Sequence, residues 1–318
     1  MKKETQEGGP DVQFTNLYGG KVVVRFHPSN HAYWVSTDSG KTFKRKTGVT
    51  TYLGIKDKST ALGKWQQQIT ADFLLAKIEA GVKIDVDLAL EAAVQNDVQR
   101  DSAADIGKLI HSWAEATIRK ELKLTKEVPD MPDFPEAVTG ANAFMEWREA
   151  HKIKFVSTER VVYSRKHDFV GQMDFEAVVD GELCMGDFKS STGLYNGVRM
   201  QTAAYAEADM EEAGKRKYAG RWAVRLSKYT EAEYMRREMR KAEMRKAIAR
   251  IQGKDSKDYP IKPYKVFEAV FLDNDRRAMK YDFAAFLACK ELTAWDRATN
   301  GWGEGLSIDQ ADYTKLAE

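Results

Sequence analysis

The segment Gly171-Gln-Met-Asp-Phe-Glu-Ala-Val-Val-Asp-Gly-Glu-Leu-Cys-Met-Gly-Asp-Phe-Lys189 carries the strongest structural signal in this chain. Asp180-Gly181 near its middle predicts a two-residue hairpin turn, because both central positions of a type I′ turn need positive φ. Two antiparallel strands flank such a turn, so Asp174 faces the neighbourhood of Asp187. Both carboxylates are therefore expected at the open end of one hairpin.

The chemistry of this hairpin end follows from the residue types. Side chains alternate along a strand, so Asp187 and Lys189 point to one face while Phe188 points to the other, into a core. Two carboxylates held close together repel each other unless a cation neutralises them. Carboxylate oxygens are the ligands that Mg²⁺ prefers, and a neighbouring lysine can orient or acidify an attacking water. The pattern is typical of metal-assisted phosphodiester cleavage.

The Asp-x-Lys motif alone is weak evidence for a catalytic site in a chain with 31% charged residues, and two flanking helices add further candidate site residues. Residues 105–118 predict a helix that carries His111, although a lone histidine on a helix is more often structural than a ligand. Gln201 and Tyr205 share one face of another helix, where Tyr205 is either a site residue or a core residue. Glu115, one turn after His111, either holds the imidazole as an outer ligand or is a solvated helix charge.

The order of these motifs resembles a known family. Gly-x-x-x-His, Gly-x-x-Asp, Gly-Asp-Phe-Lys and Gln-x-x-x-Tyr occur in the order found in the PD-(D/E)XK nuclease superfamily, and within it in the RecB-type and phage exonucleases. The resemblance covers roughly residues 49 to 228. Its first part, residues 48–54 and 62–65, is similar to mitochondrial genome-maintenance exonucleases. Asp187 departs from the many members that carry glutamate there, and the shorter carboxylate still reaches a metal.

The resemblance implies a role for each motif residue. The implied metal ligands are His111, Asp174, Asp187 and the backbone carbonyl of Phe188, holding Mg²⁺ or Mn²⁺. The implied catalytic residues are Asp174, Asp187 and Lys189, with Lys189 positioning the water. The implied DNA contacts, near the scissile phosphate, are Gln201 and Tyr205.

The implied activity is metal-dependent exonucleolytic hydrolysis of DNA in phage or prophage recombination or DNA processing. The expected partners are DNA with a free end and a single-strand annealing or binding protein. The alternative is a catalytically silent DNA-binding or recombinase-loading subunit with the same fold. That alternative is disfavoured because a pure binding protein has no need for a clustered acid pair.

The expected fold is α/β, with a restriction-endonuclease-like central mixed sheet flanked by helices and a helical N-terminal half. We expect a disordered tail at 1–10, an N-terminal hairpin and helical cap at 11–100, and a nuclease core at 101–318 with a helical insertion at 230–253. The expected strands are 21–27, 31–35, 156–165, 169–179, 182–188, 219–227 and 264–272. The expected helices are 59–81, capped by Ser59, then 85–97, 101–122, 136–151, 230–253 and one carrying Gln201.

Basic charge is clustered although the formal net charge is only +2. Groups at 41–46, 56–58 and 215–217, with Arg221 and Arg225, could neutralise phosphates along a groove. In the helix at 230–253, seven basic residues between positions 236 and 250 accompany two acids. That helix either holds a DNA strand, opposes a partner protein or packs with a solvent-facing surface.

Composition bounds the remaining possibilities. No window approaches the length of a membrane span, and the first ten residues lack the apolar core of a signal peptide. We therefore expect no membrane partner and a cytoplasmic location, in the host if the chain is phage-encoded. Cys184 and Cys289 are the only cysteines, so neither a disulfide framework nor a four-cysteine iron–sulfur cluster is expected from this chain alone.

Overall fold

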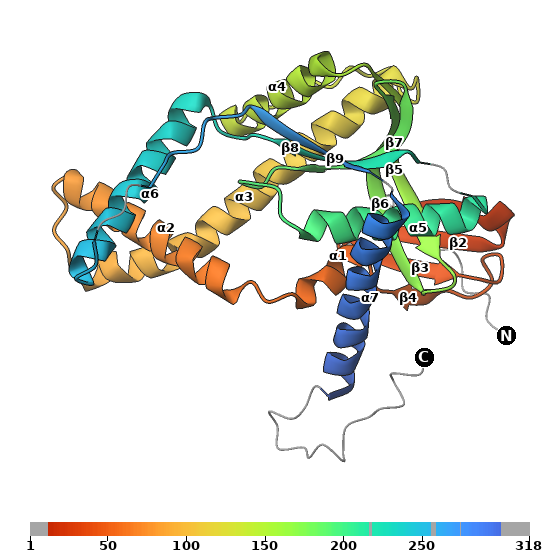
Figure 1. Ribbon diagram of the computed structural model, residues 1–318, viewed down its shortest axis with the longest axis horizontal. Helices are drawn as coiled ribbons and strands as arrows, with labels where there is room; N and C mark the ends of the chain where they lie inside the picture. Colours follow the sequence, from red (N-terminus) through yellow and green to blue (C-terminus); the bar gives the residue numbers. More distant parts are fainter. Residues whose placement is uncertain (1–11, 216–217, 256–258, 274, 300–318) are drawn as a thin grey trace.

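The computed structural model describes residues 12–215, 218–255, 259–273 and 275–299. The protein is α/β, with a central mixed sheet flanked by helices and a helical segment in its N-terminal half, as the sequence predicts (Figure 1). The expected tail at 1–10 lies outside the described residues, so its disorder stays a prediction. Within the described part of the chain, no helix combines the length and apolar content that crossing a membrane requires.

The central sheet has five strands in sequence order. They are β5 (Ile153–Ser164), β6 (Phe169–Val179), β7 (Glu182–Lys189), β8 (Gly220–Leu226) and β9 (Phe267–Asp273). Neighbouring strands are antiparallel except β7 and β8, which are parallel. A parallel pair needs a crossover connection, and helix α5 (Gly197–Ala213) provides it. The crossover places the helix of Gln201 directly after the strand of Asp187.

The hairpin turn between β6 and β7 is confirmed. Asp180 and Gly181 have φ values of 51° and 96°, and Val179 pairs with Glu182. Alternation along β7 also follows the prediction, since Phe188 is buried in an aromatic cluster on the sheet face opposite Asp187. The turn chemistry and the strand period together fix which side chains reach the site.

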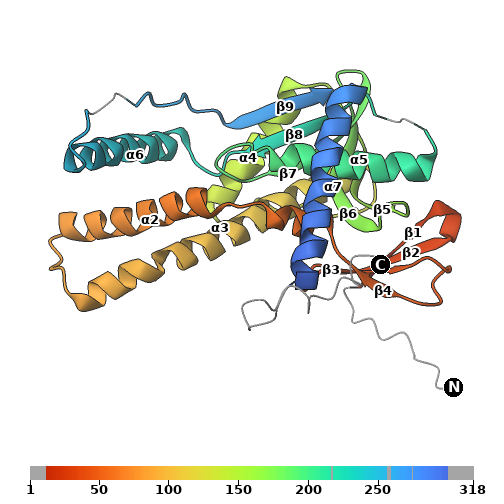
Figure 2. The same cartoon turned by 60° about the horizontal axis from the view of Figure 1, so that its bottom comes forward.

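Helices cover both faces of the central sheet, as Figures 1 and 2 show. Helices α3 (Val86–Glu121) and α4 (Pro135–Ala150) pack on one face, where Phe144 and Trp147 are fully buried. Helix α5 and helix α7 (Arg276–Thr299) pack on the other face. Helix α7 is not among the predicted elements, although its buried Met279 and Phe286 follow helical spacing.

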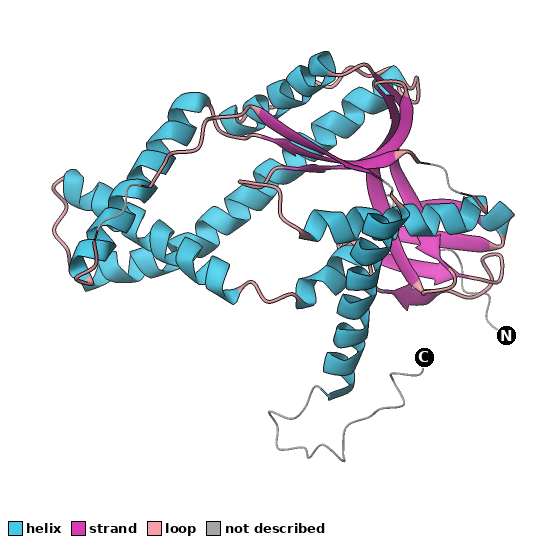
Figure 3. Cartoon of the chain, in the orientation of Figure 1, coloured by secondary structure: helices cyan, strands magenta, loops and turns pink. Residues whose placement is uncertain are grey.

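A second, antiparallel sheet adjoins the first (Figure 3). Its strands are β1 (Gln13–Leu17), β2 (Val22–His27), β3 (Ala32–Ser36) and β4 (Lys44–Lys46), with a 3-10 turn η1 (Tyr18–Gly20) after β1. Strands β2 and β3 are the predicted hairpin, and β1 and β4 extend it. Valines of β2 pack against Val161, Tyr163 and Val170 of the central sheet, so the two sheets share one apolar cluster.

The helical segments differ from expectation in two places. The helices expected at 85–97 and 101–122 form one helix, α3, because residues 98–100 contain neither glycine nor proline to end it. The expected domain boundary at 100 therefore falls inside α3. The N-cap position of helix α2 (Ser59–Glu79) is Lys58 rather than Ser59, and its side chain makes no capping hydrogen bond. The Asp57 carboxylate accepts the Ser59 N–H instead.

Helix α6 (Glu231–Ile251) lies close to its predicted range. The short helix α1 (Val49–Tyr52), continued by the 3-10 turn η2 (Leu53–Ile55), was not among the predicted elements. Helix α6 begins with a capping box, in which Thr230 and Glu233 bind each other's backbone N–H groups. Only Ala249 of α6 is buried, so this helix presents most of its surface to solvent.

Candidate active site

Three acidic residues form a row across adjacent strands. Asp174 of β6 lies one position beyond the Phe175–Gly186 pair, which places it opposite Asp187 of β7. The β5–β6 pairs on either side, Thr158 with Phe175 and Arg160 with Met173, place Glu159 opposite Asp174. The hairpin therefore brings together the two predicted acids, and β5 adds a third.

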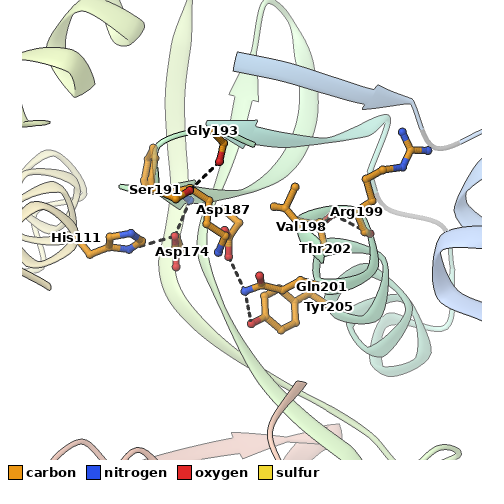
Figure 4. A network of polar contacts seen from close by, with 12 residues as sticks. His111, Asp174, Asp187, Ser191, Gly193, Val198, Arg199, Gln201, Thr202 and Tyr205 are labelled. Atoms are coloured by element: carbon orange, nitrogen blue, oxygen red, sulfur yellow. Dashed lines mark hydrogen bonds and ion pairs between the residues drawn. The ribbon is translucent and has the colours of Figure 1, made fainter. Parts of the chain in front are cut away.

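His111 of α3 reaches this row from the side. Its Nδ1 lies 3.4 Å from Oδ2 of Asp174, and the same carboxylate oxygen accepts the Phe188 backbone N–H at 2.6 Å (Figure 4). The helix and the strand end are thereby joined through one carboxylate. His111 and Asp174, two of the predicted metal ligands, lie side by side.

Asp187 is held by two side chains. Lys189, two positions along the same strand, forms an ion pair with its Oδ2. Gln201 of α5 donates from Nε2 to Asp187 Oδ1 at 2.8 Å and also contacts the Tyr205 hydroxyl at 3.0 Å (Figure 4). The predicted i,i+4 pair on α5 therefore acts as one unit that orients Asp187.

Two motif glycines allow these elements to approach closely. A Cβ on Gly171 would lie 2.3 Å from the Tyr205 ring, and a Cβ on Gly107 would lie 2.7 Å from Oγ of Ser190. Real Cβ atoms do not tolerate such distances, so glycine at 171 lets α5 pack on β6, while at 107 the Ser190 side chain would have to rotate to make room for a Cβ. The glycines of the motifs are thus spacing residues for the site.

A cavity of about 480 Å³ contains these groups. Its walls come from β3, α1, α3, β5, β6, β7 and α5. The predicted residues in its lining are His111, Glu115, Asp174, Asp187, Lys189, Gln201 and Tyr205. The structure therefore brings every predicted site side chain into one cavity.

The electrostatics of this cavity are dominated by crowded carboxylates. Burial, and then the charge of Asp187, raise the pKa of Asp174 to about 6. Burial, and then the charges of Asp174 and Glu115, raise the pKa of Glu159 to about 9. Burial lowers the pKa of Lys189, but the charges of Asp187 and Asp174 outweigh it and the net shift is upward. Lys189 therefore stays a cation at neutral pH.

A divalent cation fits the donor types in this cavity. Two aspartates offer hard oxygens and His111 a nitrogen. Burial, and then neighbouring negative charge, raise the pKa values of Asp174 and Glu159, and a bound cation would oppose both effects. Among the described residues, no group of three or more His, Cys, Asp or Glu side chains is already arranged to hold a metal ion. Lys189 and Gln201 bind Asp187, while His111 and the Phe188 N–H bind Asp174. The metal site therefore stays a prediction.

Other predicted roles stand as follows. Tyr205 is buried in the core on α5, which supports the structural reading of its ring, while its hydroxyl reaches the cavity. Glu115 lines the cavity and pairs with Arg119 at 3.6 Å, and burial raises its pKa. The Phe188 backbone meets the site through its N–H, and metal binding by its carbonyl stays a prediction. DNA contacts by Gln201 and Tyr205 stay predictions as well.

Glu159 was not predicted as a site residue. It has a φ of 50° inside β5, a left-handed conformation rare for a residue other than glycine. The sequence signal that could have found it is the turn between β5 and β6, whose register places residue 159 opposite residue 174. The conformation itself cannot be read from a glutamate in a strand pattern.

Arg221 was expected to neutralise phosphates, and that expectation is wrong. Its side chain is fully buried, and its guanidinium pairs with Asp282 at 2.8 Å and donates to the Arg199 carbonyl. It is a structural link between β8, α5 and α7. Of the same predicted basic group, Lys217 lies outside the described residues.

The cavity, its carboxylate row and its lysine thus stand on geometry alone. Comparison of the chain with protein-family models and with curated protein sequences finds no match in either.

Proposed function

We propose that this protein is a metal-dependent deoxyribonuclease that hydrolyses phosphodiester bonds, acting on DNA from a free end. The observation that carries the proposal is the meeting of Asp174, Asp187 and Lys189 at the ends of one hairpin, in a cavity that also receives His111 and Gln201. Hydrolysis of a phosphodiester requires charge neutralisation at the phosphate and an oriented water, and these residue types supply both.

The residues of the site divide this work. The Lys189 ammonium is held over the site by Asp187, where it can donate a hydrogen bond to an attacking water or a phosphate oxygen. Gln201 fixes the Asp187 carboxylate from the opposite side. His111 and the Phe188 N–H fix Asp174. Each reacting group is thus oriented by a neighbour before substrate arrives.

A bound Mg²⁺ or Mn²⁺ would supply Lewis-acid stabilisation of the phosphate and lower the pKa of a bound water. Asp174, Asp187 and His111 would hold the cation. The carboxylate row favours its binding, since burial and then repulsion between like charges raise the pKa values of Asp174 and Glu159, and a cation relieves both effects.

The first prediction concerns Asp187→Ala and Lys189→Ala. Each variant should lose at least about a hundredfold in cleavage rate while keeping its DNA affinity. Asp187→Ala should keep its fold, since it removes one acid from the crowded row, whereas Lys189→Ala should lower the melting temperature, because it leaves Asp187 without its ion-pair partner. The measurement uses end-labelled linear and circular DNA, single- and double-stranded, with Mg²⁺, Mn²⁺ or chelator. Linear DNA should be cut and closed circles spared.

Two results would contradict the proposal. Cleavage by either variant within about tenfold of the wild-type rate would remove the site assignment. DNA binding without cleavage by the wild type under all metal conditions would favour the silent DNA-binding or recombinase-loading subunit. A phage or prophage role, a cytoplasmic location and a single-strand annealing or binding partner stay predictions from the sequence.

A further inference from the structure

A second cavity, of about 430 Å³, lies between α2, α6 and the loop after β8. We call it the α6 pocket. Its basic lining residues are Arg225, Lys228, Arg237, Lys241, Arg245 and Lys262, and its acidic ones are Asp72 and Glu238. Figure 2 shows α6 running beside α2, so this pocket has one helix on each side.

The basic groups of the α6 pocket exceed the acids available to them. Glu238 forms an ion pair with Lys241, with 2.6 Å between the charged atoms, and Asp72 forms one with Arg240 at 3.2 Å. Within the described residues, no ion pair involves Lys228, Arg237, Arg245 or Lys262. Four cations thus share a half-enclosed pocket without carboxylate partners, which is a binding environment for an anion with several charges.

The pKa of Lys228 is affected by this excess of positive charge. Burial, and then the positive charge of Arg237, lower its pKa, and only Glu136 opposes the shift. The Arg237 guanidinium stacks over the Tyr229 ring, 4.4 Å from its centroid, which holds it toward the pocket. The situation mirrors the carboxylate row, because here like positive charges are crowded and an anion would relieve them.

Aromatic rings are interleaved with these cations. Trp65, Tyr195, Tyr229 and Tyr234 line the pocket, and Tyr195 is 65% exposed. Bases of a single strand stack on exposed aromatic side chains regardless of sequence, whereas a paired duplex does not offer its base faces. A basic pocket with an exposed ring at Tyr195 therefore fits single-stranded DNA better than a small phosphate or a duplex.

The α6 pocket is connected to the candidate active site. A third cavity of about 200 Å³ shares Lys189 and Gln201 with the active-site cavity. The same cavity shares Ser191 and Tyr195 with the α6 pocket. The three cavities therefore lie next to one another, in series between the carboxylate row and helix α6.

We propose that the α6 pocket is a binding subsite for single-stranded DNA, which holds backbone phosphates and stacked bases several nucleotides away from the bond placed at Asp187. The inference rests on the proposed function for the direction of the path, while binding itself can be measured without cleavage. Helix α6, one of whose readings from sequence was a DNA-holding helix, is then the outer wall of the substrate path.

The test measures binding of fluorescent oligothymidylates by anisotropy in chelator, over a range of salt concentrations. Lys228→Gln combined with Arg237→Gln should weaken binding of a long oligomer by roughly tenfold or more. It should also reduce the slope of log affinity against log salt concentration (the salt slope) by about 1.4, since each phosphate contact to a single strand contributes about 0.7 to that slope. Tyr195→Ala should weaken binding about tenfold with an unchanged salt slope, because it removes stacking and no charge.

The matched control is Arg250→Gln combined with Lys254→Gln, which removes two exposed charges from the end of the same helix and its C-terminal turn. It should leave affinity near the wild-type value. Thermal unfolding of all variants separates lost folding from lost binding.

The outcomes separate this inference from the proposed function. Equal affinity and equal salt slope for wild type and the Lys228/Arg237 variant would overturn the subsite, even if the enzyme cuts DNA. Weakened binding in that variant supports the subsite, even if the wild type cuts nothing. Equal weakening by the Arg250/Lys254 control would also overturn it, because it would mean non-specific attraction to a basic helix.

Discussion

The pKa of Glu159, raised from 4.5 to about 9, is shifted further than that of Asp174 beside it. Its side chain is half-buried opposite Asp174, and its backbone adopts a left-handed conformation in the middle of a strand. Such conformations cost of order 1–3 kcal/mol and persist where the surrounding structure enforces them. The fold therefore keeps a third acid in the row against both backbone preference and electrostatic repulsion.

Glu159 gives the stability of the protein a predictable pH dependence. Its pKa is about 9 in the fold against an ordinary value of 4.5, so between these values the folded state keeps a proton that the unfolded state releases. Stability is therefore lost as pH rises through this window. Asp174, with a pKa of about 6, contributes in the same direction at lower pH.

The corresponding prediction is that Glu159→Gln raises the melting temperature at about pH 8 in chelator by a few degrees, since 1 kcal/mol corresponds to about 2–4 °C in a domain of about 200 residues. The difference from wild type should shrink toward about pH 5, where both side chains are neutral. Glu149→Gln, at an exposed position on α4, is the control and should leave the melting temperature unchanged at both pH values. A constant difference at all pH values would argue against a buried, protonated Glu159.

At the scale of elements, the sequence was informative where turn chemistry or capping is local. Asp180-Gly181 set the hairpin and its register, and Thr230 with Glu233 set the start of α6. Strands β1 and β4 are short, and their pairing depends on β2 and β3, so no local signal marks them. Helix α3 was divided in error because a polar stretch weakens the apolar period without stopping a helix.

The parts of the candidate site that depend on local pairing and spacing could be predicted from the sequence. Register placed Asp174 near Asp187, and helical spacing paired Gln201 with Tyr205. The burial of Arg221 could not be predicted, because its partner Asp282 lies on α7, far away in sequence. Interactions between distant elements depend on the whole fold, and a local pattern does not contain them.

Helix α6 offers a prediction at this scale. Thr230→Ala removes one half of the capping box, in which Glu233 N–H donates to Thr230 Oγ1, and should cost about 1 kcal/mol. Since α6 is mostly exposed, the loss should appear as local opening, with amide exchange in its first turns about fivefold faster. Thr60→Ala, exposed in the first turn of α2, should leave exchange in α6 unchanged. Unchanged exchange in the Thr230 variant would mean that tertiary contacts hold α6.

At the scale of the whole molecule, two charge arrangements lie along one path. The carboxylate row is buried between the central sheet, α3 and α5, and the unpaired cations face it from the α6 pocket across a shared cavity. A net charge of +2 conceals this separation. The central sheet supplies the rigid site, while α2 and α6 reach beyond it to supply the outer part of the path (Figure 1).

Arg240 bridges the two helices that flank that path. Its guanidinium lies 3.2 Å from Asp72 and 3.6 Å from Glu79, both on α2, and Asp72 is also a wall of the α6 pocket. Such partly exposed ion pairs contribute only about 0–1 kcal/mol to stability. We propose a consequence for how substrate leaves: the bridge would hinder a strand from lifting out sideways more than from sliding lengthwise.

The proposed nuclease should therefore be processive, removing many nucleotides from one strand before it takes another. Arg240→Ala should make it distributive while changing the melting temperature little and the initial cleavage rate less than about threefold. The measurement adds excess unlabelled DNA after the first cuts and follows the length of the labelled strand. Arg250→Ala serves as control, and an equal number of nucleotides removed per encounter by the Arg240 variant and the wild type would show that the bridge does not retain the strand.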